Sequence, residues 1–179
     1  MRGLWAGAAL LLVSACAAPG FLLPAADAEF ELAGRIAVSY RDDAGSGNIA
    51  WRHAPSSDEM LLTTPLGQGV ARLVRAQGAI VLTTQDGREF RAADAESLTE
   101  QVLGFRVPIV DLADWVRGRA AREPAPAPLR ERRDAAGRLV ELEQAGWRVE
   151  YLAYEGALPS RLRLNFPGVE LRLAISEWR

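Results

Sequence analysis

The chain has 179 residues, a net charge of −2 and a single cysteine, and 49% of its residues are hydrophobic. Losing Arg2 with a cleaved leader would take the charge from −2 to −3, and this weakly acidic balance argues against nucleic acid as a partner, because nucleic-acid binding depends on a basic surface. No internal disulfide can form from one cysteine, so the fold must be held together by burial of apolar side chains.

The first residues have the layout of a secretory signal peptide. Met1-Arg2-Gly3 is a short positive start, and residues 4–13 form an apolar run well short of the roughly 20 residues that a membrane span needs. Val13-Ser14-Ala15-Cys16 resembles the bacterial lipobox, whose cysteine is lipidated and becomes the first residue after cleavage. The sequence therefore predicts a signal peptide over residues 1–15 and a lipid anchor at Cys16.

Cleavage by the ordinary signal peptidase is the alternative. Ala15-Cys16-Ala17 also fits the A-x-A rule, and cleavage there would release a soluble protein. Residue 17 is not aspartate, the residue that retains lipoproteins at the inner membrane in the best-known sorting rule. The lipobox resemblance therefore implies a lipid anchor in the outer membrane, with the protein facing the periplasm. Residues 16–29 are expected to be the lipidated cysteine and a proline- and alanine-rich tether, whose thirteen residues after Cys16 span at most about 45 Å.

Strands with one apolar face follow the tether. Residues 30–40 alternate between apolar and polar side chains, which is typical of a strand with one buried face. A turn is expected at residues 43–47, and Asp86-Gly87 predicts a hairpin turn. Further strands are predicted at residues 49–51, 59–64, 69–75, 79–84, 89–93, 147–151, 161–166 and 169–176.

Between these two blocks of strands the apolar period lengthens to that of a helix. Asp94 can cap a helix that ends at Gly104, and residues 109–118 predict a second helix. The proline-rich residues 123–128 predict a stiff connection. The order predicts one α+β domain over residues 30–179, a curved antiparallel sheet with helices on its dry face. Two short helices cannot cover all of that face, so the rest closes as a barrel with a filled core or lines a cavity.

Two stretches resemble the LolB family of outer-membrane lipoprotein receptors. They are residues 45–73 and residues 86–119, the second including the Asp-Gly turn, the Ala-Asp-Ala helix start, Pro108 and a Leu-x-x-Trp-Val-x-Gly helix. The resemblance implies a LolA/LolB-like fold, an incomplete β-barrel lidded by helices, whose apolar interior accepts the acyl chains of lipoproteins. It implies no enzymatic activity, no catalytic residue, no cofactor and no metal. The implied partners are the periplasmic carrier LolA, lipoprotein cargo and the inner leaflet of the outer membrane, and we expect a monomer.

The resemblance also assigns roles to residues. Pro65-Leu66-Gly67 matches the protruding loop whose exposed leucine is implicated in delivering cargo to the bilayer. A leucine between proline and glycine at a turn is expected to be exposed, and it would gain about 1.5–3 kcal/mol on entering lipid; the alternative is a leucine folded back onto the barrel. The acyl cavity is expected to be lined by Ile36, Val38, Trp51, Met60, Leu62, Leu112, Trp115, Trp147, Val149, Tyr151, Leu164 and Leu173. The tryptophans fit a packed core as well.

Two other classes of function are alternatives to the receptor. His53 is the sole histidine, and it has neither the cysteines for a metal site nor a nucleophile motif for a hydrolase. A lipid hydrolase therefore lacks its catalytic pair. The stronger alternative is a lipid-anchored structural or envelope-assembly lipoprotein with a filled barrel core. The segment between Cys16 and the first strand is also shorter than in the family pattern.

Overall fold

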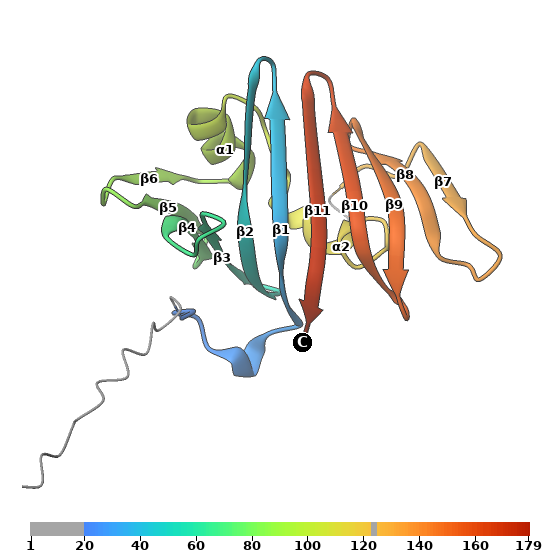
Figure 1. Cartoon of the computed structure of the whole chain (residues 1–179), viewed down its shortest axis with the longest axis horizontal. Helices are drawn as coiled ribbons and strands as arrows, with labels where there is room; N and C mark the ends of the chain where they lie inside the picture. Colours follow the sequence, from blue (N-terminus) through green and yellow to red (C-terminus); the bar gives the residue numbers. More distant parts are fainter. Residues whose placement is uncertain (1–19, 123–124) are drawn as a thin grey trace, which may run out of the picture.

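The strands form one open antiparallel sheet in the computed structural model, which describes residues 20–122 and 125–179. The sheet has 11 strands in the order β6-β5-β4-β3-β2-β1-β11-β10-β9-β8-β7. Their bounds are β1 Phe30–Tyr40, β2 Asp43–Ala54, β3 Ser57–Thr63, β4 Gly69–Ala76, β5 Ala79–Thr84, β6 Glu89–Ala92, β7 Arg130–Arg133, β8 Leu139–Gln144, β9 Trp147–Glu155, β10 Leu158–Phe166 and β11 Val169–Trp178. The edge strands β6 and β7 do not pair with each other, so the barrel is incomplete, as predicted (Figure 1).

The first and last strands join the two halves of the sheet. β1 pairs with β11 along almost its whole length, from Leu32 opposite Trp178 to Tyr40 opposite Val169. Beyond this ladder, Glu31 and Arg179 exchange two backbone hydrogen bonds of 2.8 and 2.9 Å. The meanders β1–β6 and β7–β11 therefore share one continuous sheet, and the helices lie in the connection between them (Figure 1).

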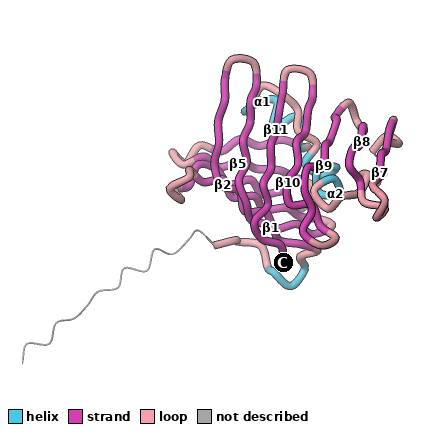
Figure 2. Tube along the Cα trace, turned by 45° about the vertical axis from the view of Figure 1, so that its right-hand side comes forward, coloured by secondary structure: helices cyan, strands magenta, loops and turns pink. Residues whose placement is uncertain are grey.

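Both helices lie on the same face of the sheet, which we call the inner face; the opposite face is the outer face (Figures 1 and 2). Helix α1 spans Ala95–Leu103 and helix α2 spans Ile109–Trp115. The predicted cap of α1 is confirmed, since the Asp94 carboxylate accepts the backbone N–H of Ser97 at 2.7 Å and Gly104 ends the helix with φ of 81°. Helix α2 ends before the predicted Gly118, because the last residues close into tighter turns onto the carbonyls of Asp114 and Trp115.

The predicted turn at residues 43–47 is wrong. Strand β2 begins at Asp43, which pairs directly with Tyr40, so the hairpin turn consists of Arg41 and Asp42 alone. Arg41 takes the left-handed conformation, with φ of 55°, that such a tight turn requires. Gly45, which suggested a turn in the sequence, is instead a strand residue opposite Val38.

Strands β7 and β8 were not predicted. Every side chain of β7 is charged, so this edge strand carries no apolar alternation. In β8 the two fully buried leucines, Leu139 and Leu142, are three residues apart, because the pairing with β7 shifts register between Arg132 and Arg133. A bulge of this kind hides the period of two that identifies a strand in a sequence.

Candidate functional site

All twelve residues predicted to line an acyl cavity lie in the hydrophobic core or pack against it. Eight are buried, and they are Trp51, Met60, Trp115, Trp147, Val149, Tyr151, Leu164 and Leu173. Four are half-buried: Ile36, Val38, Leu62 and Leu112. The structure therefore divides the predicted lining into a packed floor and a partly exposed apolar group.

The three predicted tryptophans fall into two clusters. Trp115 of α2 and Trp147 of β9 lie together with ring centroids 6.4 Å apart, and the Trp115 indole N–H donates to Gln144 Oε1 at 2.9 Å. The Tyr151 hydroxyl donates to the Trp115 carbonyl at 3.0 Å, and burial raises the pKa of Tyr151 so that it stays a donor. Trp51 packs elsewhere, edge-on to Phe30 at 5.2 Å. Helix α2 is thus fixed to the C-terminal half of the sheet.

The half-buried apolar side chains of β1 face strand positions that have no side chain. Ile36 lies opposite Gly47 and Val38 lies opposite Gly45 across the β1–β2 pair. A Cβ added at Gly45 would meet nothing within 4 Å, so the space beside Val38 is open. This end of the inner face is therefore apolar and uncovered, which suits a guest hydrocarbon chain better than the packed floor does.

The connection between α1 and α2 is fixed next to the end of β1. The Tyr40 hydroxyl donates to the Gly104 carbonyl at 3.0 Å, and the Tyr40 and Phe105 rings lie 5.0 Å apart. On the other side, the backbone N–H of Val107 donates to the buried Thr99 hydroxyl at 2.8 Å. The helices are therefore held in place at the edge of the uncovered apolar group.

Asp111, in the first turn of α2, carries an electrostatic penalty. Its partial burial raises the pKa of the Asp111 carboxyl, and the carboxylates of Glu96 and Asp114 raise it further. A folded pKa above the unfolded one means that ionisation destabilises the fold as the pH rises through these values. We expect Asp111→Asn to increase the melting temperature at pH 7 and to have no such effect below about pH 3, where Asp is largely protonated in both states. Thermal unfolding at both pH values measures this, and equal effects at both would contradict it.

The loop that carries Leu66 is a fixed turn with an exposed tip. Leu66 is 90% exposed. The backbone N–H of Gly67 donates to Thr64 O and that of Thr64 donates to Gln68 O, both at 2.8 Å, and Gly67 has φ of 85°. The side chain is therefore held away from the sheet, as the sequence predicts; its contact with a bilayer stays a prediction.

The N-terminal segment is fastened to the outer face. Cys16 lies outside the described residues. The described part of this segment crosses β4, β3 and β2. The Gly20 carbonyl accepts from Arg72 Nη2 at 3.2 Å, the backbone N–H groups of Leu22 and Leu23 donate to Glu59 Oε2 at 2.7 and 2.8 Å, and the Leu23 carbonyl accepts from Arg52 Nη1. Glu59 is fully buried and its other oxygen lies 3.2 Å from Nη1 of Arg72. Sequence analysis did not predict these contacts between Glu59 and the N-terminal segment. The available signal was the acidic Glu59 next to the apolar residues of β3.

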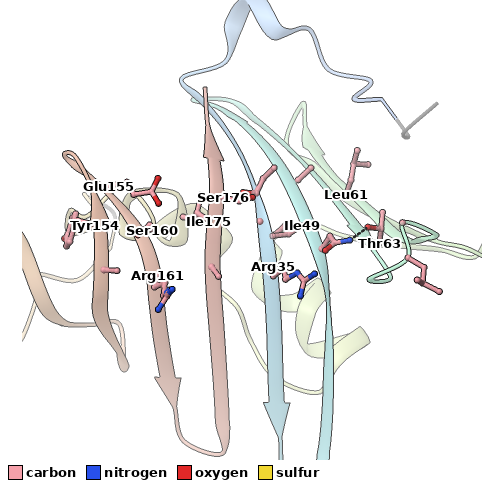
Figure 3. Close-up of a pocket in the computed structure, with 18 of the residues that line it drawn as sticks. Arg35, Ile49, Leu61, Thr63, Tyr154, Glu155, Ser160, Arg161, Ile175 and Ser176 are labelled. Atoms are coloured by element: carbon pink, nitrogen blue, oxygen red, sulfur yellow. Dashed lines mark hydrogen bonds between the residues drawn. The ribbon is translucent and has the colours of Figure 1, made fainter. Parts of the chain in front are cut away.

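A groove of about 1360 Å³ crosses the outer face. Figure 3 shows Arg35 on β1 and Arg161 on β10, on either side of β11, with the helices behind the sheet. The groove reaches Leu66 and Gly67 at one end and Glu155 of β9 at the other. Sequence analysis gave these arginines no role.

The described residues hold neither a cluster of metal-ligating side chains nor a membrane-spanning helix. In residues 20–122 and 125–179, histidine, cysteine and acidic side chains do not gather in threes where a metal ion could be held. Within the same residues, neither helix is long and apolar enough to cross a membrane.

Comparison with known proteins agrees with the resemblance. The family model described as outer membrane lipoprotein LolB matches residues 28–178. An outer-membrane lipoprotein LolB from Azoarcus is 39% identical over 176 residues, covering 93% of this chain and 89% of the relative. The corresponding protein from Thiobacillus denitrificans is 38% identical over 161 residues, covering 88% and 83%.

Solved structures support the fold. A LolA superfamily protein from Nitrosomonas europaea superimposes with a TM-score of 0.56 at 13% identity, covering 86% of each chain. A putative outer membrane lipoprotein-sorting protein domain from Vibrio parahaemolyticus gives a TM-score of 0.55 at 10% identity, covering 86% of this chain and 87% of that one. At such identities the likeness concerns the fold alone.

Proposed function

The chain belongs to the LolB family of outer-membrane lipoproteins, and from this membership we propose that it accepts lipoproteins from the periplasmic carrier LolA and inserts them into the outer membrane. The observation that carries the proposal is that four of the predicted lining residues, Ile36, Val38, Leu62 and Leu112, which we call the uncovered apolar group, pack at the margin of the core and stay only half-buried. Large contiguous apolar patches are rare on the surface of a soluble domain unless they meet a ligand or a partner. Here the group lies in the family's acyl-binding fold.

The physical need for a receptor follows from the cargo. Each CH₂ group exposed to water costs about 0.8 kcal/mol, so an acyl chain of about sixteen carbons costs on the order of 12 kcal/mol if it crosses water unshielded. A hand-over between two apolar faces avoids most of that cost. In this scheme Cys16 holds the protein on the membrane, the inner face holds the acyl chains, and Leu66 enters the bilayer ahead of them.

One observation favours the structural lipoprotein as a second candidate. Eight of the twelve predicted lining residues are buried against one another, which is the packing of a filled core. The two functions differ in a simple test. LolA loaded with an acylated lipoprotein is mixed with the unacylated Cys16→Ser chain, and the cargo is followed by pull-down. Transfer supports the receptor; retention on a LolA that still delivers to its own receptor would leave the structural role.

Leu66→Glu separates insertion from acceptance. Placing a charge at the exposed tip removes about 1.5–3 kcal/mol of favourable lipid contact, so insertion of cargo into liposomes by the anchored chain should fall at least about 10-fold. Acceptance of cargo from LolA should not change, because the Leu66 side chain is 90% exposed at the tip of its loop and is not one of the inner-face group. Leu129→Glu, at an 85% exposed leucine preceding β7, is the matched control and should insert normally. Equal insertion by both variants would contradict the role of Leu66.

A further inference from the structure

Small and basic side chains form one row across the outer face. The register places Asn48 opposite Arg35, Arg35 opposite Ala174, and Ala174 opposite Arg161. Adjacent strands are about 4.8 Å apart, so the two arginines rise from the same face on either side of Ala174, whose methyl group leaves the space between them open. Arg35, Ala174 and Arg161 line both of the cavities on this face, which measure about 1360 and 330 Å³. Figure 3 labels the two arginines in the larger one.

The charges of this row differ from those of the strands beside it. Arg163 lies 3.2 Å from Glu150 and 3.5 Å from Glu170, so this outer-face arginine is neutralised by its neighbours. Arg35 and Arg161 have no carboxylate within 4.0 Å in the part of the chain that the structure describes. Both are exposed, so their charge is available to a partner on this face.

The row ends at the predicted membrane loop. Asn48 Nδ2 donates to the Thr64 carbonyl at 3.0 Å, which ties the row to the turn that presents Leu66. Pro65 borders the smaller cavity, and so does Leu152 of β9, an outer-face leucine that is 54% exposed. Arg35 and Arg161, which lack ion pairs among the described residues, therefore lie between the exposed Leu66 and Leu152. A lipid–water interface has the complementary order, with anionic headgroups over apolar chains.

We propose that the outer face is a docking site for anionic phospholipid headgroups of the membrane, with Arg35 and Arg161 binding their phosphates. A guanidinium binds phosphate through two parallel N–H groups, and a pair of them on either side of Ala174 matches one headgroup or two neighbouring ones. This inference rests on the proposed function, since it places the Leu66 loop at the bilayer. Glu155, at the β9 end of the groove, is the acidic residue of its lining and limits the docking site to the part around the two arginines.

Vesicle binding tests the proposal. The described contacts lie within residues 20–179, so the mature chain with Cys16→Ser keeps the domain and loses the anchor. The probes are vesicles of phosphatidylcholine alone and of phosphatidylcholine with 30% phosphatidylglycerol. Each arginine is expected to contribute about fivefold to partitioning, so Arg35→Gln with Arg161→Gln should reduce binding to the anionic vesicles about 25-fold, to the level on neutral vesicles. Binding by the parent chain should weaken as salt is added.

The matched control is Arg41→Gln with Arg130→Gln. These arginines also lack an ion pair among the described residues, and they lie at the β1–β2 turn and on edge strand β7, so the net charge changes equally. Circular dichroism and thermal melting establish that both double variants are folded. The control should bind anionic vesicles as the parent does; equal losses in both double variants would mean an effect of net charge and would overturn the site.

Three further outcomes would overturn the proposal. The first is equal binding of the parent chain to neutral and anionic vesicles. The second is full displacement of the parent chain from anionic vesicles by millimolar glycerol phosphate at constant ionic strength. The third is a loss of cargo transfer from LolA in the Arg35→Gln with Arg161→Gln variant without a change in its vesicle binding. The second would indicate a site for soluble phosphate, and the third a contact with the carrier. The proposed function is tested separately, because acceptance of cargo from LolA in solution needs no membrane and fails or succeeds independently of these vesicle results.

Discussion

Leu112→Glu is expected to reduce acceptance of lipoprotein from LolA about 100-fold while leaving the fold intact. Leu112 is half-buried on α2 and belongs to the uncovered apolar group. In the empty protein a glutamate there can keep contact with water. An entering acyl chain would remove that water from the carboxylate, at a cost of a few kcal/mol. The measurement is a pull-down of labelled cargo after mixing the Cys16→Ser chain with loaded LolA.

Val110→Glu is the matched control, because it places the same charge on the same helix at a side chain that is 50% exposed. It should accept cargo as the parent does. Normal acceptance by Leu112→Glu would exclude the uncovered group as the acyl site. Gly45→Leu provides a second variant without a charge: its side chain has free space beside Val38, so it fills the opening from the strand side and should also reduce acceptance. Melting temperatures near that of the parent would show that both variants fold.

The sequence predicts the elements whose pattern is local. Strand β1 alternates along its full length, and α1 has Asp94 at its start and Gly104 at its end, so both were predicted within a residue of the observed bounds. Strands β7 and β8 were missed because an all-charged edge strand and a bulge have no alternation to detect. Gly45 suggested a turn because glycine at a turn and glycine in a strand look alike in one sequence.

The sequence predicted which side chains form the site. It did not predict which of them are buried and which stay half-buried. Burial follows from alternation, so every predicted lining residue is on the inner face or in α2. Which of them stay uncovered depends on what lies across the strand pair, and only the register shows that Val38 faces Gly45. The charges of Arg35 and Arg161 were equally visible in the sequence, but their lack of partners follows from three strands that are distant along the chain.

The docked N-terminal segment changes the geometry expected of the tether. Thirteen flexible residues could span about 45 Å, but Leu22 and Leu23 are held on β3 by Glu59. Residues from Leu22 onward therefore add no free length to the tether. Leu22 and Thr63, at the start of the Leu66 loop, line one cavity of about 450 Å³. Leu22 and the start of the Leu66 loop therefore lie next to each other on the domain.

Asp58→Ala should cost about 3–5 kcal/mol of the free energy of unfolding, the largest effect on stability that we expect from one substitution. Asp58 is fully buried on the inner face. Its Oδ1 accepts the indole N–H of Trp51 at 2.8 Å and lies 2.7 Å from His53 Nδ1, and its Oδ2 lies 2.6 Å from the Arg75 guanidinium. This carboxylate joins three neighbouring strands, and its removal leaves a partly buried cation and two donors without their acceptor.

Urea unfolding with Asp86→Ala as the control gives the comparison. Asp86 also pairs with an arginine, Arg88 at 2.7 Å, but both side chains are more than half exposed, so its loss should cost less than about 1 kcal/mol. Similar losses of unfolding free energy in the two variants would show that the buried interactions of Asp58 stabilise the fold no more than the exposed Asp86–Arg88 pair does. A large loss confined to Asp58→Ala would explain the one histidine of the chain: His53 holds a buried carboxylate that fixes β2, β3 and β4, and of these β3 carries Leu62 and leads into the Leu66 loop.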